Sequence, residues 1–419
     1  MEVDHVIKVT LTNEILKRIS EIDEKRFSLS TIEMPPVIKN KLRKNSKKKS
    51  SYASNKIEGN PLTEKQANEA IDSDSHKHFL KPEQEVRNYF LALNFLEEKL
   101  KKKEAFSKEM ILEVQAMVEK GASKEKIGLR GPMPPGMLFA VYDSETGAAE
   151  YIPPEYIDIP DLLDELVEYV NTTDDHPLII AAVVHYQLVT IHPFEDGNGR
   201  LARILSDMLL ARGEKSELRF YNISAQINKD KNHYYDILER MQRGDGDITE
   251  WLVWYMKKLL DALDEAETMV TTILNKSFFW QKASSVPMTE RQTKMLNLFL
   301  DGYEAKITSK TWASLAKCSK DTAIRDIQDL VSKNILVEDI PGAKRPSYSI
   351  VFDAEDLTQF FTDVCITQEN ATPYLNALFK GHRKVCERIL PLDAERYQKG
   401  DLLLPNLLNK YCSYLMAND

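Results

Sequence analysis

One stretch of the sequence decides the fold: residues 177–203 read PLIIAAVVHYQLVTIHPFEDGNGRLAR. Its first half, residues 178–191, is apolar on nearly every side, which is typical of a helix buried at the centre of a bundle. Because Pro193 disfavours helical geometry at the residue before it, this helix is expected to end at His192. The imidazole would then lie at the mouth of the loop that follows.

The loop after this histidine carries residue types that bind a polyanion. Gly197 and Gly199 permit backbone angles closed to other residues, so the loop can curl with its N–H groups inward, and a new helix begins at its far end. Arg200 and Arg203 lie three apart on one face of that helix, where both can bind the same triphosphate. Asp196 offers a hard oxygen ligand for Mg²⁺ beside the phosphates.

His192 and its neighbours suit the transfer of a phosphorus-centred group, in which positioning and charge stabilisation dominate. An imidazole that titrates near neutrality can take the proton from an attacking hydroxyl, so His192 is the candidate general base. His185 lies about two turns earlier on the same helix, too far for both rings to bind one metal ion directly. It is predicted to pack in the core.

The segment from His192 to Arg203 resembles the Fic motif, HPFx(D/E)GNGRxxR, and matches it at every fixed position. The resemblance covers roughly residues 51–254 and implies a mainly α-helical Fic core with a small β-hairpin flap. It also implies that His192 is the general base, that Phe194 anchors the loop in the core, and that Asp196 binds Mg²⁺. The implied nucleotide-binding residues within the motif are Gly197, Asn198, Gly199, Arg200, Leu201, Ala202 and Arg203.

The resemblance further implies transfer of AMP from ATP to a Ser, Thr or Tyr hydroxyl of a target protein, or of the chain itself. Asn198 and Gly199 would bind the α- and β-phosphates, and the two arginines the β- and γ-phosphates. Doc-like relatives, which transfer a phosphoryl group instead, carry Lys where this chain has Gly199, which favours AMP transfer. Two alternatives stay open: an enzyme that also removes AMP from its target, and a DNA-binding regulator that uses the Fic domain as a nucleotide sensor.

A second match to the family lies upstream, where residues 54–60 read SNKIEGN. This stretch resembles the inhibitory motif (S/T)xxxE(G/N), in the class whose inhibitory helix precedes the Fic core in the same chain. Ser54 and Glu58 lie four apart and share a helix face, so both side chains can point into one pocket. By the resemblance, Glu58 pairs with Arg203, withdraws that arginine from the γ-phosphate and so inhibits the enzyme.

Two further groups of residues are assigned by resemblance. The flap residues are Leu138, Phe139, Ala140 and Val141. Such a flap pairs its edge with an extended segment of the target protein as an added strand. Tyr234 and Tyr235 resemble the paired aromatic residues that hold adenine, and Gln242 stands where the family often has a polar adenine contact. Because tyrosines on helices are more often core residues than ligands, packing in the core is the alternative for this pair.

Helical periodicity and its breaks divide the chain into four segments. They are an N-terminal helical segment at 1–80 with the inhibitory helix at about 50–58, the Fic core at 81–284, a winged helix-turn-helix at 285–352 and a helical tail at 353–419. Three helices followed by two short strands predict the winged helix. Its candidate recognition helix mixes charges of both signs and offers Asp321, Asp326 and Asp329 to a phosphate backbone, so protein interaction or a homodimer stays open beside nucleic-acid binding.

Composition and charge limit the classes of protein and the cellular location that this chain can have. The 419 residues, 42% of them hydrophobic, can form a sizeable core. The N-terminus lacks the positive charge of a signal peptide and no apolar run is long enough to cross a bilayer, so a cytoplasmic protein without a membrane partner is expected. The net charge of -9 disfavours non-specific binding to nucleic acid. The basic run at 41–49 is interpreted as a solvated loop between two helices.

Overall fold

The protein is mainly helical, and the chain divides into two compact units, residues 1–30 with 34–266 and residues 31–33 with 267–419. The computed structural model describes residues 7–30, 32, 36–73, 78–121, 127–142, 149–214, 219, 221–303 and 305–351. The predicted tail at 353–419 lies outside the described residues. The two units part within a single helix, whereas the sequence predicted a boundary at 284, and the functional division of the chain stays a prediction.

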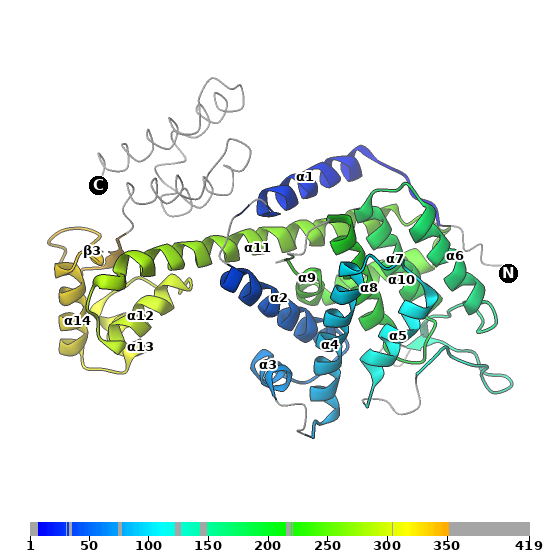
Figure 1. Cartoon of the computed structure of the whole chain (residues 1–419), viewed down its shortest axis with the longest axis horizontal. Coiled ribbons are helices and arrows are strands. Elements are labelled where there is room, and N and C mark those ends of the chain that lie inside the picture. The colour runs from blue at the N-terminus through cyan, green and yellow to red at the C-terminus, as the bar shows by residue number, and fades with distance from the viewer. Residues whose placement is uncertain are drawn as a thin grey trace. The chain divides into compact units, whose positions relative to one another are not determined.

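The first unit is a helical bundle with one small hairpin (Figure 1). Its helices are α1 (Asn13–Ser30), α2 (Pro36–Ile57), α3 (Glu64–Asp72), α4 (Lys81–Lys101), α5 (Lys108–Glu119), α6 (Ile159–Thr172), α7 (Pro177–Ile191), α8 (Asn198–Glu214), α9 (Ile223–Lys229), α10 (Lys231–Gln242) and the first part of α11 (Thr249–Lys282). Among the described residues, no helix combines the length and the apolar character needed to cross a bilayer.

Helix α7 lies in the core, as its all-round apolar sequence predicts. Its side chains are almost all buried, and α8 packs directly against it. His185 is completely buried, and its Nε2 lies 3.0 Å from the Tyr234 hydroxyl. Burial lowers the pKa of His185 well below its usual value, so the ring is a neutral core group.

The basic run at 41–49 is part of helix α2, so the prediction of a solvated loop was wrong. No glycine or proline interrupts this run, and carboxylates of neighbouring helices neutralise its lysines. Lys44 and Lys48 both pair with Asp72 on α3, and Lys49 pairs with Glu265 on α11. The predicted short inhibitory helix is therefore the last part of a 22-residue helix.

The hairpin is shorter than the sequence predicted. Strands β1 (Val141–Tyr142) and β2 (Ala149–Tyr151) run antiparallel, with Val141 opposite Tyr151. Residues 138–140 precede the strand, so of the four predicted flap residues only Val141 is paired. The predicted turn after Tyr142 lies outside the described residues.

The second unit contains α12 (Glu290–Leu300), α13 (Ser309–Ala316), α14 (Lys320–Ser332) and the antiparallel strands β3 (Leu336–Glu338) and β4 (Tyr348–Ile350). Its core is built around the buried Trp312. Asp326 on α14 is buried and bonded through both oxygens to Arg291, at 2.6 and 2.8 Å, and accepts from Trp312 Nε1. This buried carboxylate accepts hydrogen bonds within the unit, so it is not available to face a phosphate backbone. The winged-helix assignment stays a prediction.

Candidate functional site

The loop between α7 and α8, residues 192–197, is closed by its own hydrogen bonds. Phe194 N donates to Asn198 Oδ1 at 3.1 Å, and Asn198 Nδ2 donates back to Phe194 O at 2.8 Å. Phe194 is fully buried and anchors the loop. Gly197 adopts a φ of 82°, and a β-carbon there would collide with the Glu119 carboxylate. The Asn198 side chain thus closes the loop with Oδ1 and one Nδ2 hydrogen, and its second Nδ2 hydrogen and backbone N–H are the groups that could serve a phosphate.

His192 ends α7 in the left-handed conformation, with φ 48° and ψ 57°. A bulky residue is rarely found there. Its Nδ1 lies 3.3 Å from the Val189 carbonyl oxygen. When Nδ1 carries the hydrogen for that contact, Nε2 keeps its lone pair. Burial, assisted by the charge of Arg130, lowers the pKa of His192 to about 4. The ring is therefore neutral at pH 7 and able to accept a proton.

Arg130 holds the backbone of the base in place. Its Nε donates to His192 O at 2.8 Å, its backbone N donates to Pro193 O at 2.9 Å, and its Nη2 donates to Pro154 O. The guanidinium also lies 4.6 Å from the centre of the Phe139 ring, and that ring lies 5.9 Å from the His192 ring. Arg130 thus connects the base to the segment that leads into the hairpin.

Arg200 lies between two carboxylates at the start of α8. Its Nη2 is 2.7 Å from Glu119 Oε1 and 3.3 Å from Asp196 Oδ1. The side chains of Arg200 and Glu119 are 5% and 1% exposed. Burial raises the pKa of Glu119, and the charge of Arg200 opposes that rise. Glu119, at the end of α5, therefore positions an arginine of the motif.

Arg203 is fully buried and bound to the end of α2. Its Nε donates to Ser54 Oγ at 2.8 Å, and its Nη2 donates to Ser54 O at 3.1 Å and to Glu58 Oε1 at 2.5 Å. A β-carbon at Gly199 would collide with the Glu58 carboxylate, so the glycine makes room for this ion pair. The structure thus brings together the two residues that the resemblance paired.

Glu58 is held by the way α2 ends. Gly59 has a φ of 83°, Gly59 N donates to Lys56 O, and Asn60 N donates to Asn55 O, which together form a Schellman motif. The Asn60 side chain then donates to Pro82 O at 3.0 Å and to Glu85 Oε2 at 2.9 Å, both on α4. The carboxylate therefore projects from a fixed turn rather than from a loose loop.

The predicted adenine residues lie in different environments. Tyr234 is 1% exposed, its hydroxyl contacts His185, and its ring packs against Trp251 and Trp254, so its side chain is packed in the core, which was the alternative for this pair. Tyr235 is partly exposed, and its hydroxyl donates to Ile57 O at 3.3 Å, next to Glu58. Gln242 Nε2 donates to Thr190 Oγ1 at 3.2 Å, two residues before the catalytic candidate.

Leu201 and Ala202 are completely buried, so their side chains belong to the core. Only the backbone of these two residues could serve a nucleotide. Leu138 is 67% exposed, whereas Phe139 and Ala140 are partly buried. The flap segment thus places Phe139 beside the base and leaves Leu138 in solvent.

Comparison with known proteins agrees with this geometry. A family model described as the Fic/DOC family matches residues 105–210, which run from α5 through the hairpin, α6 and α7 into most of α8. These residues form a Fic domain. Two curated relatives, both named protein adenylyltransferase Fic, are 28% identical to this chain. The relative from Drosophila mojavensis aligns over 55% of this chain and 43% of its own length, and the relative from Nematostella vectensis over 56% and 52%.

The chain spans about half the length of the curated relatives it matches. Among solved structures, a Fic family protein from Desulfovibrio desulfuricans G20 superposes with a TM-score of 0.53 at 20% identity. The match covers 83% of this chain and 98% of that one. This likeness supports the fold of the Fic domain and its flanking helices.

Asp196 is the residue of this Fic domain that fits a metal ion. Its side chain is 36% exposed at the loop, and its Oδ1 accepts from Gly197 N at 2.7 Å and faces Arg200. No group of three or more His, Cys, Asp or Glu side chains arranged to hold a metal ion occurs in the described part of the chain. A single carboxylate fits Mg²⁺, which takes its remaining ligands from phosphates and water.

Two positions in the Fic domain were missed by sequence reasoning. Glu119 lies far upstream of the motif, and only the packing of α5 against α8 brings it to Arg200. Arg130 lies in the segment before the predicted flap and belongs to no motif. The weak signal for both is a charged residue near a glycine at a break between helices, at Glu119-Lys120-Gly121 and Arg130-Gly131.

Proposed function

We propose that this chain is a protein adenylyltransferase that moves AMP from ATP to a hydroxyl side chain of a target protein. One observation carries the proposal: Arg200 Nε and Nη1 and Arg203 Nη1 are buried, and within the described residues they have no hydrogen-bond partner. Buried donors normally have partners. Three such donors beside a neutral histidine and a glycine-rich loop suit a polyphosphate ligand.

The base in this reaction is His192. Its neutral ring takes the proton from the acceptor hydroxyl of Ser, Thr or Tyr as that oxygen attacks the α-phosphorus of ATP. The new bond joins the acceptor oxygen to phosphorus, the bond between the α-phosphorus and the bridging oxygen breaks, and pyrophosphate leaves. Because the backbone of the base is tied to Arg130, the ring is held in place before the substrates arrive.

Arg200, Arg203 and the N–H groups at the start of α8 stabilise the negative charge that develops on the leaving pyrophosphate. Mg²⁺ held by Asp196 would neutralise the phosphates and orient them for in-line attack. Glu119 keeps the Arg200 guanidinium at the loop. Gly199 leaves room beside the phosphates, where a lysine would add a side chain.

Glu58 inhibits this reaction through Arg203. With Ser54 Oγ, Ser54 O and Glu58 Oε1 as acceptors, Arg203 has one nitrogen, Nη1, left without a partner in the described structure. An ATP γ-phosphate that needs Arg203 must displace the Glu58 carboxylate. The inhibited and active states therefore differ in which anion holds one buried arginine.

The reaction type is tested with the Glu58→Gly protein and two preparations of ATP, labelled in the α- or the γ-phosphate. The proposal expects protein-bound label from the α-labelled preparation alone, and none when His192→Ala is added to Glu58→Gly. Label from the γ-phosphate would instead identify a phosphotransferase. Equal α-label with and without His192 would remove the base from the mechanism.

A further inference from the structure

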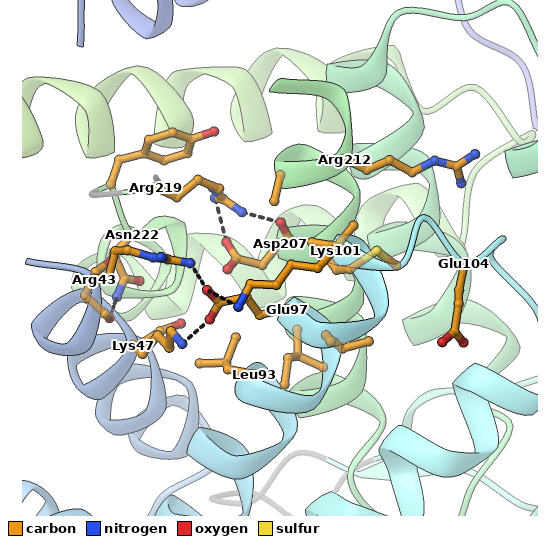
Figure 2. A pocket seen from close by; sticks show the side chains of 18 of the residues that line it. Arg43, Lys47, Leu93, Glu97, Lys101, Glu104, Asp207, Arg212, Arg219 and Asn222 are labelled. Atoms are coloured by element: carbon orange, nitrogen blue, oxygen red, sulfur yellow. Dashed lines mark hydrogen bonds and ion pairs between the residues drawn. The ribbon is translucent and has the colours of Figure 1, made fainter. Parts of the chain in front are cut away.

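A cavity lies in the first unit, away from the motif. It has a volume of about 700 Å³ and is formed by α2, α4, α8 and the residues just before α9 (Figure 2). That volume is within the range of sites that enclose a small molecule. None of the residues assigned to the nucleotide lines it.

The lining of this cavity has more positive than negative side chains. The basic residues are Arg43, Lys47, Lys101, Lys103, Arg212 and Arg219. The acidic residues are Glu97, Glu104 and Asp207. Asp207 pairs with Arg219 at 2.7 Å, and Glu104 pairs with Lys99, which does not line the cavity. These two carboxylates therefore do not neutralise the other basic residues of the lining.

The excess of positive over negative side chains is greatest around Glu97. Figure 2 shows Arg43, Lys47 and Lys101 turned toward this carboxylate, and ion pairs join it to all three. Lys101 also pairs with Glu98, at 2.8 Å against 4.0 Å to Glu97. Their side chains are 18%, 24% and 44% exposed. Burial, with the charges of Arg43 and Lys101, lowers the pKa of Lys47 to about 8. Arg43 and Lys47 are two partly buried cations that share the Glu97 carboxylate, which favours a second anion between them, with Lys101 at its edge.

The rest of the wall is apolar. It is formed by Leu93, Leu96, Leu100, Ile204, Met208 and Ala211. A ligand that fills this space would therefore combine an anionic group, placed at the three cations, with an apolar body against the leucines of α4 and the apolar face of α8.

We propose that this cavity binds a small molecule with one phosphate or carboxylate group and an apolar portion, and that the bound molecule holds α2 against α4 and α8. Arg43 and Lys47 belong to α2, which continues through Ser50 and Ser54 and is followed directly by Glu58. Ile204 follows Arg203 directly on α8. The cavity thus lies between the two helices that the Glu58–Arg203 pair joins. Any effect on AMP transfer rests on the proposed function, whereas the binding itself does not.

Binding is tested by titration calorimetry of the whole chain with phenyl phosphate, inorganic phosphate and phenol. Phenyl phosphate should bind most tightly, since it alone offers both the charge and the ring. Lys101→Gln should weaken its binding about tenfold, the value of one charge-assisted hydrogen bond of about 1.5 kcal/mol. Lys102→Gln, an exposed neighbour outside the lining, should bind as the parent protein does.

Two outcomes would overturn the site. Phenyl phosphate could give no binding at millimolar concentration, or it could bind equally well to both lysine variants, which would place the anion elsewhere, for instance at the motif arginines.

Hydrogen exchange tests, without any activity assay, whether the bound ligand holds α2. Phenyl phosphate should slow amide exchange in residues 41–50 of α2 in the parent protein, and unchanged exchange in the bound state would refute the claim that the ligand holds α2.

Discussion

The most informative perturbation is the removal of the carboxylate from position 58. Glu58 contributes one charge-assisted hydrogen bond to Arg203, at 2.5 Å, and such bonds are worth about 1.5–3 kcal/mol. The Glu58 side chain is 36% exposed, so water screens the pair and the lower part of that range, about 1.5–2 kcal/mol, applies. If ATP must displace this bond to bind productively, Glu58→Gly should raise AMP transfer at limiting ATP by about 10- to 30-fold.

The assay is the initial rate of incorporation of labelled AMP into protein, measured at several ATP concentrations. Glu58→Gln keeps the shape and removes the charge, so its rate should lie between those of the parent and Glu58→Gly. Glu64→Gly, at an exposed glutamate six residues further on, is the matched control and should leave the rate unchanged. A Glu58→Gly rate equal to that of the parent would refute the inhibitory role of this ion pair.

Three further predictions follow from the same contacts. Glu119→Ala removes one partner of a buried ion pair and should lower the free energy of unfolding by about 3–5 kcal/mol in urea denaturation, whereas Glu113→Ala, on the exposed side of α5, should change it little. Asn60→Ala loses the bonds that tie the end of α2 to α4, so it should raise the AMP-transfer rate of the otherwise unchanged protein, and a lower rate would contradict the anchoring role. Because the lowered pKa of His192, about 4, leaves the base form in place above that pH, the Glu58→Gly rate should be flat between pH 6 and 8, and an inflection near 6.5 would show an ordinary histidine.

The local parts of the site could be predicted because sequence order decides them. The apolar run of α7, the proline after His192 and the glycines of the loop act within a few residues of each other. They end the helix, turn the chain and start α8. The pairing of Glu58 with Arg203 came from the resemblance alone, since nothing in the spacing of these two residues places α2 against α8.

Other features depend on neighbours that are distant in sequence. The basic run of α2 is helical because Asp72, Glu97 and Glu265 neutralise it from three other helices. Tyr234 was assigned to adenine by resemblance, with packing in the core as the alternative, and aromatic residues of α11 pack against its ring. Glu119 was missed because a charged residue beside a glycine-containing break is a weak signal, and only the packing of α5 against α8 brings this carboxylate to Arg200.

The central claim is that His192 and the arginines of α8 transfer AMP once Glu58 is removed. Mass spectrometry of the Glu58→Gly protein, incubated with ATP, Mg²⁺ and a lysate containing target proteins, tests it most directly. We expect AMP joined to a Ser, Thr or Tyr side chain of the chain itself or of a lysate protein, and no such product when His192→Ala is added. A product that persists in the double variant, or none in Glu58→Gly with ATP bound, would contradict the claim.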